Sequence, residues 1–298
     1  MTNSNAPILV AGATGAVGGL VARKLLAAGI PVRALGRNVA KLAALKLAGA
    51  DTVSVDLLDR AAVARACEGV DQVYSTVNNV MGRGTSSPNR VDVAAHQSLV
   101  AAARGARVKR CVYLSGGDMS ADSPVDFFRT KHAIEEVVRA SGVPYVVIQP
   151  SAFMEIWVAM MTDGIRKNGT IMLFGDGRMV SNYIAGEDVA EISARILMRP
   201  EIVNESIKLG GPSNISGEQL AALVEAQLGV KAKRRRIPTP VLWTGGLLLR
   251  PFNEVAARLM RMGYYTATRD GRFTDSAVVA ERFGVSPMTI ESFMANLT

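Results

Sequence analysis

A short apolar segment, Ile8–Ala11, leads directly into a loop with three evenly spaced glycines, Gly12, Gly15 and Gly18. Apolar residues then recur at helical spacing, so the local order is strand, glycine loop, helix. In such a loop the first glycine permits a sharp turn, the second lets backbone N–H groups approach a pyrophosphate, and the third lets the helix pack on the strand. The sequence therefore predicts a dinucleotide-binding βαβ unit, with a tight structural turn as the alternative.

The first 150 residues alternate β-branched apolar runs with longer segments of helical period, which is typical of parallel strands joined by helices. We predict strands at 8–11, 32–35, 52–55, 72–76, 108–114 and 145–149, and helices near 17–28, 38–48, 59–68, 90–104 and 126–141. After Pro150 we predict helices near 152–168, 187–198, 217–228, 253–262 and 288–296, with extended pieces at 170–174 and 206–209. The expected fold is α/β: a doubly wound parallel sheet of the Rossmann type in residues 1–150, and a smaller, mostly helical lobe in residues 151–298, forming one compact body.

Composition excludes several classes of protein. With 49% hydrophobic and 20% charged residues in 298, the chain is of ordinary globular composition. Its two cysteines and two histidines argue against a disulfide framework or a metal site. The N-terminus lacks the basic region of a secretory signal, and the apolar run 241–249 is too short to span a bilayer. We therefore expect a cytoplasmic protein without a transmembrane segment.

Positive charge gathers in the last part of the chain, where residues 231–298 hold 11 basic and 5 acidic residues. The main cluster is 231–236 (KAKRRR), which is either a solvated edge or a surface that attracts an anionic partner. Because no nucleic-acid-binding module accompanies it, we expect a small-molecule substrate and neither a nucleic-acid nor a membrane partner. The sequence does not decide the subunit number, and a homodimer is compatible with it.

The segment after the second predicted strand indicates which dinucleotide binds. NAD selection usually requires a carboxylate there, but no acidic residue occurs between Gly18 and Asp51. Arg37 and Lys41 stand in that region instead, and a guanidinium can form charge-assisted hydrogen bonds to a 2′-phosphate. We therefore predict NADPH as the cofactor, while Lys41 alone could equally belong to a solvated helix face.

Polar residues that end the third and fourth strands lie at the carboxyl edge of the sheet, where dinucleotides bind. Asp56 could accept a hydrogen bond from an adenine amino group, or it could cap the helix that begins near Asp59. Thr76 and Val77 end the fourth strand and are candidates for contact with ribose or phosphates.

A lysine stands on an otherwise apolar helical stripe. Lys131 shares this stripe with Phe127, Ile134 and Val138, on a helix whose first turns lie beside the carboxyl ends of the strands. An inward lysine there could bind ribose hydroxyls and act as an acid or base, although its ammonium could instead reach solvent. Ser115 ends the fifth strand. Without a G-x-S-x-G motif, a hydrolase triad is not supported.

The motifs together resemble a known family. They are 12–18 (GATGAVG), 37–38 (RN), 55–57 (VDL), Ser115, 127–131 (FFRTK), 141–145 (SGVPY) and 149–155 (QPSAFME), followed by 183–190 (YIAGEDVA) and 209–212 (LGGP). They look like the NmrA-like branch of the atypical short-chain dehydrogenase/reductases, which includes isoflavone-reductase-like enzymes and NADPH-sensing regulators. The resemblance covers most of the chain.

The resemblance implies roles for particular residues. It implies that the glycine loop (Gly12, Thr14, Gly15, Ala16, Val17 and Gly18) and Arg37 hold NADPH, that Asp56 and Leu57 flank adenine, and that Pro150 and Phe153 lie by the nicotinamide. Lys131 matches the lysine that binds the nicotinamide ribose and takes part in proton transfer. Independently of the resemblance, Lys41, Thr76 and Val77 are expected cofactor contacts from their positions, and we expect Ser115 to hold the substrate oxygen. Candidate substrate walls are Phe153, Met154, Trp157, Met161 and Tyr183, although methionines at helical spacing are more often core residues.

One position departs from the wider dehydrogenase pattern. Standard short-chain dehydrogenases carry Tyr-x-x-x-Lys, but here the tyrosine position is Phe127, which has no proton to donate. The expected function is an NADPH-dependent reductase of a small apolar carbonyl, enone or quinone-like substrate, in a pocket between the sheet edge and the second lobe. The alternatives are a regulator that senses NADP(H) without turnover, or an isomerase or epimerase that keeps its nucleotide bound.

Overall fold

The structure is a computed structural model that describes residues 6–296 and divides into two compact units. Unit 1 runs to Ala121 and also contains Phe127–Gln149 and Val189–Ile207. Unit 2 contains Asp122–Asp126, Pro150–Asp188 and the chain from Lys208 onward.

The centre of unit 1 is a seven-stranded sheet with the order β10-β6-β5-β4-β1-β2-β3. Its strands are β1 (Ile8–Ala11), β2 (Val32–Gly36), β3 (Asp51–Ser54), β4 (Gln72–Ser75), β5 (Arg110–Leu114), β6 (Tyr145–Pro150) and β10 (Glu205–Leu209). The ladders that join β3, β2, β1, β4, β5 and β6 are all parallel. The strand order reverses beside β1, where open α/β sheets bind their ligands. The predicted doubly wound α/β fold is confirmed.

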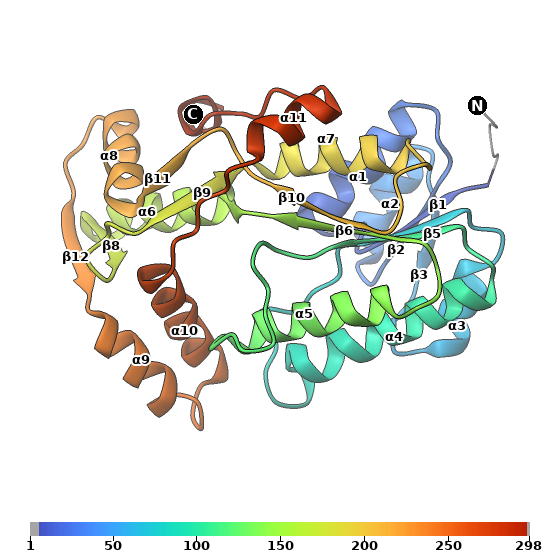
Figure 1. Cartoon of the computed structure of the whole chain (residues 1–298), viewed down its shortest axis with the longest axis horizontal. Helices are drawn as coiled ribbons and strands as arrows, with labels where there is room; N and C mark the ends of the chain where they lie inside the picture. The colour runs from blue at the N-terminus through green and yellow to red at the C-terminus, as the bar shows by residue number, and fades with distance from the viewer. Residues whose placement is uncertain (1–5, 297–298) are drawn as a thin grey trace. The chain divides into compact units, whose positions relative to one another are not determined.

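Helices cover both faces of this sheet. They are α1 (Ala16–Ala27), α2 (Val39–Leu47), α3 (Arg60–Cys67), α4 (Pro88–Gly105), α5 (Asp126–Arg139) and α7 (Gly186–Leu197), with a short 3₁₀ turn at Gly84–Ser86. Figure 1 shows α1 and α7 on one face and α3, α4 and α5 on the other. Leu9, Val73 and Cys111 belong to the core between the sheet and the second helical layer.

The segment 189–207 returns to unit 1, which the division expected at residue 150 did not include. It contributes most of α7 and the start of β10, the seventh strand, where the sequence predicted six. Side chains of the sheet hold it: Tyr74 donates a hydrogen bond to Ser193 Oγ, and Arg110 donates to the carbonyl oxygens of Ile196 and Leu197. Those carbonyls end α7 and have no partner within the helix, so Arg110 satisfies them.

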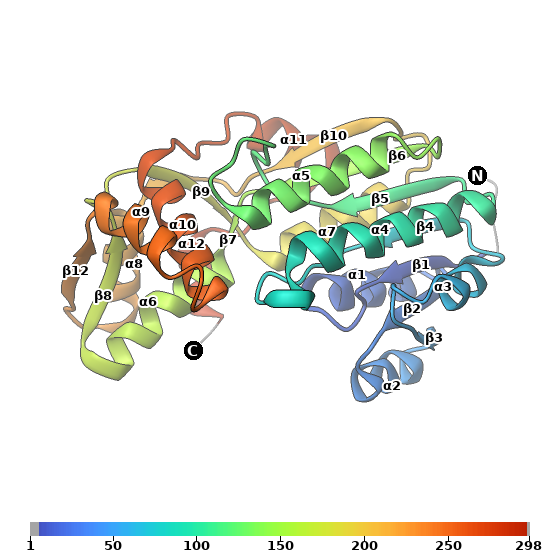
Figure 2. The ribbon, with the colours of Figure 1, turned by 90° about the horizontal axis from the view of Figure 1, so that it is seen from below.

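The described part of unit 2 contains two small sheets and six complete helices, with α7 beginning at its border. The sheets are β11-β9-β7, from Asn214–Ser216, Val180–Ile184 and Ala152–Phe153, and β12-β8, from Lys233–Ile237 and Thr170–Phe174. The helices are α6 (Met154–Asn168), α8 (Gly217–Leu228), α9 (Thr239–Leu248), α10 (Glu254–Thr268), α11 (Ser276–Phe283) and α12 (Ile290–Ala295) (Figure 2). Met154, Val158 and Met161 pack with Leu220 in the main core. Helices α9 and α11 were not predicted.

The structure also bears on two excluded classes. Within residues 6–296, no helix combines the length and the apolar character required for a membrane span. The same residues contain no group of three or more histidine, cysteine or acidic side chains arranged to hold a metal ion.

Candidate functional site

The glycine loop has a geometry that only glycine accommodates. Gly12 has φ +85°, and a Cβ there would lie 2.6 Å from Thr76 Oγ1. A Cβ on Gly18 would lie 2.3 Å from the Gly12 carbonyl oxygen, so this glycine allows α1 to pack against the loop. Helix α1 begins after Gly15 without a side-chain cap and without an acidic residue in its first turn. Its first N–H groups are therefore suited to an anion, as a pyrophosphate requires.

The end of β2 brings positive charge to the same loop. Lys41 Nζ donates a hydrogen bond to the Thr14 carbonyl oxygen at 3.2 Å, which ties α2 to the glycine loop. Asn38 caps α2 by accepting from the Lys41 N–H. Arg37 is exposed, and no hydrogen bond or ion pair is recorded for its guanidinium within residues 6–296. A free guanidinium beside the loop fits a 2′-phosphate, so these residues match the chemistry of NADP(H).

The structure settles one alternative for Asp56. Asp59, not Asp56, caps α3 by accepting from the Ala62 N–H at 3.0 Å. Asp56 accepts from the Leu58 N–H at 3.0 Å within the turn that follows β3. Leu57 is buried in the core, whereas Val77 is partly buried. The capping interpretation of Asp56 is therefore wrong, and its contact with adenine stays a prediction.

Lys131 lies inside unit 1 rather than at its surface. The residue is only 7% exposed, and Nζ donates to the Leu114 carbonyl oxygen at 3.1 Å and to the Tyr113 hydroxyl at 3.4 Å. Nζ also lies 5.2 Å from the centre of the Tyr113 ring and 5.6 Å from that of Phe127. The alternative of an ammonium that reaches solvent is therefore wrong.

Burial changes the acidity of Lys131. Desolvation lowers the pKa of Lys131 to about 8, and the carboxylates of Asp92 and Glu135 oppose this effect. At neutral pH the ammonium is still mostly protonated, so it has a proton to donate. Its pKa is nevertheless close enough to neutrality for the proton to leave readily, which suits a general acid.

The hydroxyl of Tyr113 on β5 accepts from this ammonium, and the hydroxyl of Ser115 just after β5 lies near that of Tyr113. Tyr113 is buried, which raises its pKa well above the usual value, so its hydroxyl stays protonated. The Ser115 hydroxyl is near enough to moderate that pKa, yet Ser115 Oγ makes no hydrogen bond of good geometry in the described part of the chain. A buried hydroxyl without a partner costs free energy unless a ligand provides one.

Three residues around Lys131 were not predicted from the sequence: Tyr113, Asp92 and Glu135. Tyr113 lies in an apolar strand where its hydroxyl gave no signal, and the two carboxylates lie on helices α4 and α5. His96 is buried between these elements, with Nε2 3.0 Å from Ser75 Oγ and its ring against Tyr113. Burial lowers the pKa of His96 to about 4, so its imidazole is neutral and serves packing.

The candidate substrate walls lie in unit 2. Met154 and Met161 are buried in the core, and the Trp157 ring packs edge-on against Tyr183 and Phe174, with 5.9 Å between centroids in each pair. Trp157, Met161 and Tyr183 line a cavity of about 30 Å³, which is room for one water molecule. Phe153 is half-buried at the end of β7, and Pro150 ends β6. Burial raises the pKa of Tyr183 to about 12, so its hydroxyl is neutral.

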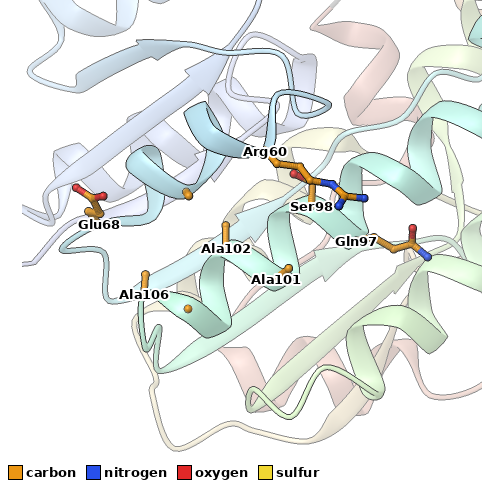
Figure 3. A pocket seen from close by; sticks show the side chains of 9 residues that line it. Arg60, Glu68, Gln97, Ser98, Ala101, Ala102 and Ala106 are labelled. Atoms are coloured by element: carbon orange, nitrogen blue, oxygen red, sulfur yellow. The ribbon is translucent and has the colours of Figure 1, made fainter.

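A larger groove of about 650 Å³ lies elsewhere in unit 1, between α3 and α4 (Figure 3). Alanines form much of its wall, and Arg60, Glu68, Gln97 and Ser98 provide polar groups. None of the predicted site residues lines this groove. Its volume alone therefore does not connect it with the glycine loop or Lys131.

Comparison with known proteins supports the family resemblance that the sequence motifs indicated. The model of the NmrA-like family matches residues 4–292. The chain belongs to the NmrA-like family. The NAD(P)H azoreductase of Xenophilus azovorans is 32% identical to this NmrA-like chain over 223 residues, 74% of each protein. The (4-alkanoyl-5-oxo-2,5-dihydrofuran-3-yl)methyl phosphate reductase of Streptomyces griseus subsp. griseus is 33% identical over 224 residues, again 74% of each.

Solved structures share the fold of this NmrA-like protein. An NADPH-dependent quinone oxidoreductase from Escherichia coli, solved with NADPH, has a TM-score of 0.82 at 22% identity, with 97% of this chain and 99% of the other covered. The triphenylmethane reductase of Citrobacter sp., solved with NADP(H), has a TM-score of 0.79 at 21% identity, with 98% and 100% covered. The predicted family is confirmed.

In this NmrA-like chain, Phe127 occupies the position four residues before Lys131. Its ring is buried beside the Lys131 ammonium and carries no ionisable group. The hydroxyl that is within hydrogen-bond distance of Lys131 comes instead from Tyr113 on β5. The structure therefore retains a lysine and a tyrosine together, although they come from different elements.

Proposed function

We propose that this NmrA-like protein is an NADPH-dependent reductase that delivers hydride to a small apolar carbonyl, enone or quinone-like substrate. The observation that carries the proposal is the buried Lys131 ammonium, which donates to the carbonyl oxygen of Leu114, the residue before Ser115. The buried Ser115 hydroxyl has no hydrogen-bond partner within the described chain. Both groups lie where β5 ends, at the edge of the sheet where dinucleotides bind. The reductase relatives support the reaction class, and the substrate class is our proposal.

The residues of the loop would hold NADPH in distinct ways. The backbone from Gly12 to Gly18 would surround the pyrophosphate, and Arg37 and Lys41 would bind the 2′-phosphate. Asp56 and Leu57 would flank adenine, and Thr76 and Val77 would border the ribose and phosphates. Pro150 and Phe153 are proposed to contact the nicotinamide. When bound, NADPH supplies the hydride.

Lys131 would donate one hydrogen bond to a ribose hydroxyl and, through that hydroxyl, relay a proton to the substrate oxygen. Its third N–H has no acceptor recorded in the described chain, since Leu114 and Tyr113 accept the other two. Ser115 Oγ would donate a hydrogen bond to the same oxygen and so gain the partner that it lacks. Phe127 excludes water from the ammonium, which keeps the pKa of Lys131 low.

The apolar residues of unit 2 would select the substrate. Phe153, Met154, Trp157, Met161 and Tyr183 are proposed as walls, because aromatic and methionine side chains adapt to flat apolar molecules. The 30 Å³ cavity beside Trp157 must widen to take such a molecule. Rotation of the Trp157 ring is the simplest change that would widen it.

A second candidate function is a regulator that binds NADP(H) and does not turn over. Phe127 favours this alternative, because the usual tyrosine acid is absent from its position. A steady-state assay of NADPH oxidation with a panel of quinones and enones separates the two functions. A reductase accelerates oxidation in the presence of a substrate, whereas a sensor binds the cofactor tightly and shows no such rate.

The cofactor assignment is tested by titrating NADPH and NADH into the wild type, Arg37→Ala and Lys46→Ala. Lys46 lies at the other end of α2, so Lys46→Ala removes one positive charge at a site away from the loop. We expect the wild type to prefer NADPH and Arg37→Ala to lose about tenfold in NADPH affinity, since a charged hydrogen bond contributes about 1.5 kcal/mol. The NADH affinity of Arg37→Ala and both nucleotide affinities of Lys46→Ala should equal those of the wild type. Equal loss for both nucleotides would contradict the assignment.

A further inference from the structure

Helix α9 and the turn that follows it expose an unusual amount of apolar surface. The helix contains no charged residue. Leu248 is 72% exposed and Phe252 is 89% exposed, and Val241, Trp243 and Leu247 are also exposed. A contiguous apolar surface of this kind marks an interaction site, because solvent contact with large side chains is unfavourable.

The exposed residues of α9 form one continuous face. Leu242 and Gly246 point inward, where Gly263 of α10 lies close to Leu242 and Arg261 lies close to Gly246. Helices α9 and α10 lie side by side (Figure 1). Trp243 borders α10 as well, with its ring against Tyr264 and Arg261. Val241, Leu247 and Leu248 of α9 turn away from α10 because they lie on the opposite half of the helical circumference. Its ten residues extend about 15 Å, too short to cross a bilayer but sufficient to lie in its interface.

Strand β12 places positive charge on the face from which this helix pair projects. Arg235 is paired with Met172 of β8, and both are exposed. Phe174, two residues further along β8, lies on the same side of the ribbon and packs close to Gly263 of α10. Lys233 and Arg235 therefore lie on the same face of the β8–β12 ribbon as α10, which packs against that face at its Phe174 end.

The cations on this face are not neutralised by the protein. Arg234 and Arg236 alternate to the opposite side of β12 and form ion pairs with Glu218, and Arg234 also pairs with Glu225. By contrast, no ion pair is recorded in the described chain for Lys233, Arg235 or Arg250. Residues 231–269 contain nine basic residues and a single acidic one, Glu254. Within the run 231–236, Arg234 and Arg236 are thus structural, whereas Lys233 and Arg235 are available to a partner.

We propose that α9, its following turn and the exposed cations of β12 form a docking surface for an anionic lipid membrane. Leu247, Leu248 and Phe252 would enter the interfacial region, while Lys233, Arg235 and Arg250 would contact lipid phosphates. Charge complementarity decides the occupant: an anionic bilayer attracts the cations and accepts the apolar side chains, whereas a second copy would bring the same positive charge against itself. This surface revises the expectation that the chain has no membrane partner.

The test is co-sedimentation of the full chain with phosphatidylcholine vesicles that contain, or lack, about one third phosphatidylglycerol. We expect the wild type to bind the anionic vesicles, to bind the neutral ones at least tenfold more weakly, and to dissociate as salt rises. The double substitution Leu248→Asp with Phe252→Asp should reduce binding at least tenfold. Both side chains are exposed, so the melting temperature should not change.

Matched controls separate this surface from general hydrophobicity and charge. Leu47→Asp alters a leucine that is 91% exposed at the end of α2 and should bind as the wild type does. Arg235→Glu with Arg250→Glu should weaken binding to the anionic vesicles and leave the melting temperature unchanged. The chain has two tryptophans, so Trp157→Phe leaves Trp243 as the only one. The fluorescence emission of Trp243 should then shift to the blue on anionic vesicles.

Three results would overturn the proposal. The first is equal binding to neutral and anionic vesicles, and the second is vesicle binding that the Leu248→Asp and Phe252→Asp pair does not reduce. The third is a concentration-dependent dimer in analytical ultracentrifugation that this pair abolishes, without vesicle binding by the wild type. That last result would assign the apolar face to a second copy of the chain.

Discussion

Unit 1 contains two buried cations, Arg110 and Lys131, that differ in how completely they are hydrogen-bonded. Arg110 on β5 is 2% exposed, and its guanidinium donates to Gln72 Oε1 and to the carbonyl oxygens of four residues, Ile196, Leu197, Arg199 and Ile202. All three of its nitrogens are engaged. Lys131 on α5 is nearly as buried, yet only two acceptors are recorded for its three N–H groups.

The difference separates a structural cation from a chemical one. The hydrogen bonds of Arg110 close the end of α7 onto the sheet and leave no donor for a ligand. Lys131 retains a donor, a pKa lowered to about 8, and a neighbour, Ser115, whose hydroxyl also has no partner within residues 6–296. Incomplete hydrogen bonding around a buried charge destabilises the fold, and it is favourable where a ligand completes it.

The largest expected effect is on stability, in Arg110→Met. This substitution leaves the Ile202 carbonyl oxygen and Gln72 Oε1 without a recorded donor, and each costs about 1 to 3 kcal/mol. The carbonyl oxygens of Ile196, Leu197 and Arg199 lose one of their two recorded donors. We expect the free energy of unfolding to fall by at least about 3 kcal/mol, measured by urea denaturation. The control Lys109→Met alters the neighbouring side chain, which is exposed, and should change stability little. If Arg110→Met were as stable as the control, the structural role of Arg110 would be wrong.

The next effect is on activity, in Lys131→Met. We expect kcat/KM for NADPH-dependent reduction to fall about 100-fold, as for loss of a general acid, without loss of stability. The exposed Lys46→Met is the matched control. A variant that retained its rate would exclude Lys131 from proton transfer.

Lys131 also predicts a pH dependence of stability. Between about pH 8 and 10.5 the unfolded lysine is protonated while the folded one is not, so the unfolded state binds more protons. The contribution of Lys131 to the free energy of unfolding therefore increases with pH over this range. The difference between the wild type and Lys131→Met in urea denaturation, followed from pH 8 to 10.5, should show this increase. A constant difference would mean that the pKa of Lys131 is not lowered.

The smallest effect is expected for Tyr113→Phe, which removes the hydroxyl that accepts from Lys131. We expect kcat to fall about fivefold, since one hydrogen bond contributes about 1 kcal/mol. With one acceptor fewer, the ammonium is less favoured and the pKa of Lys131 falls. The activity that requires protonated Lys131 should then be lost at lower pH than in the wild type.

Tyr74→Phe is the matched control for this prediction. Tyr74 is also a buried strand tyrosine, but its hydroxyl bonds to Ser193 of α7, away from Lys131. Its removal should lower stability by a similar amount and leave the pH profile of activity unchanged. Identical profiles for the two variants would show that Tyr113 acts through stability alone.

Local spacing determined the features that the sequence could predict. Three glycines between an apolar run and a helical pattern fixed the loop, and the absence of acidic residues before Asp51 left Arg37 and Lys41 as candidates for the 2′-phosphate. The helical stripe that contains Lys131 placed it on the inward face, and the structure confirms its burial. These predictions required only the periods of helix and strand, because neighbours in sequence fix them.

Only the tertiary structure decided which distant residues meet. The order of the strands brings Tyr113 of β5 to Lys131 of α5, and Arg110 to the end of α7, although 86 residues separate Arg110 from Ile196. The same holds for the run 231–236, where pairing of β12 with β8 directs alternate side chains to α8 or to solvent. Burial and hydrogen-bond partners depend on this long-range packing, and sequence spacing alone does not specify it.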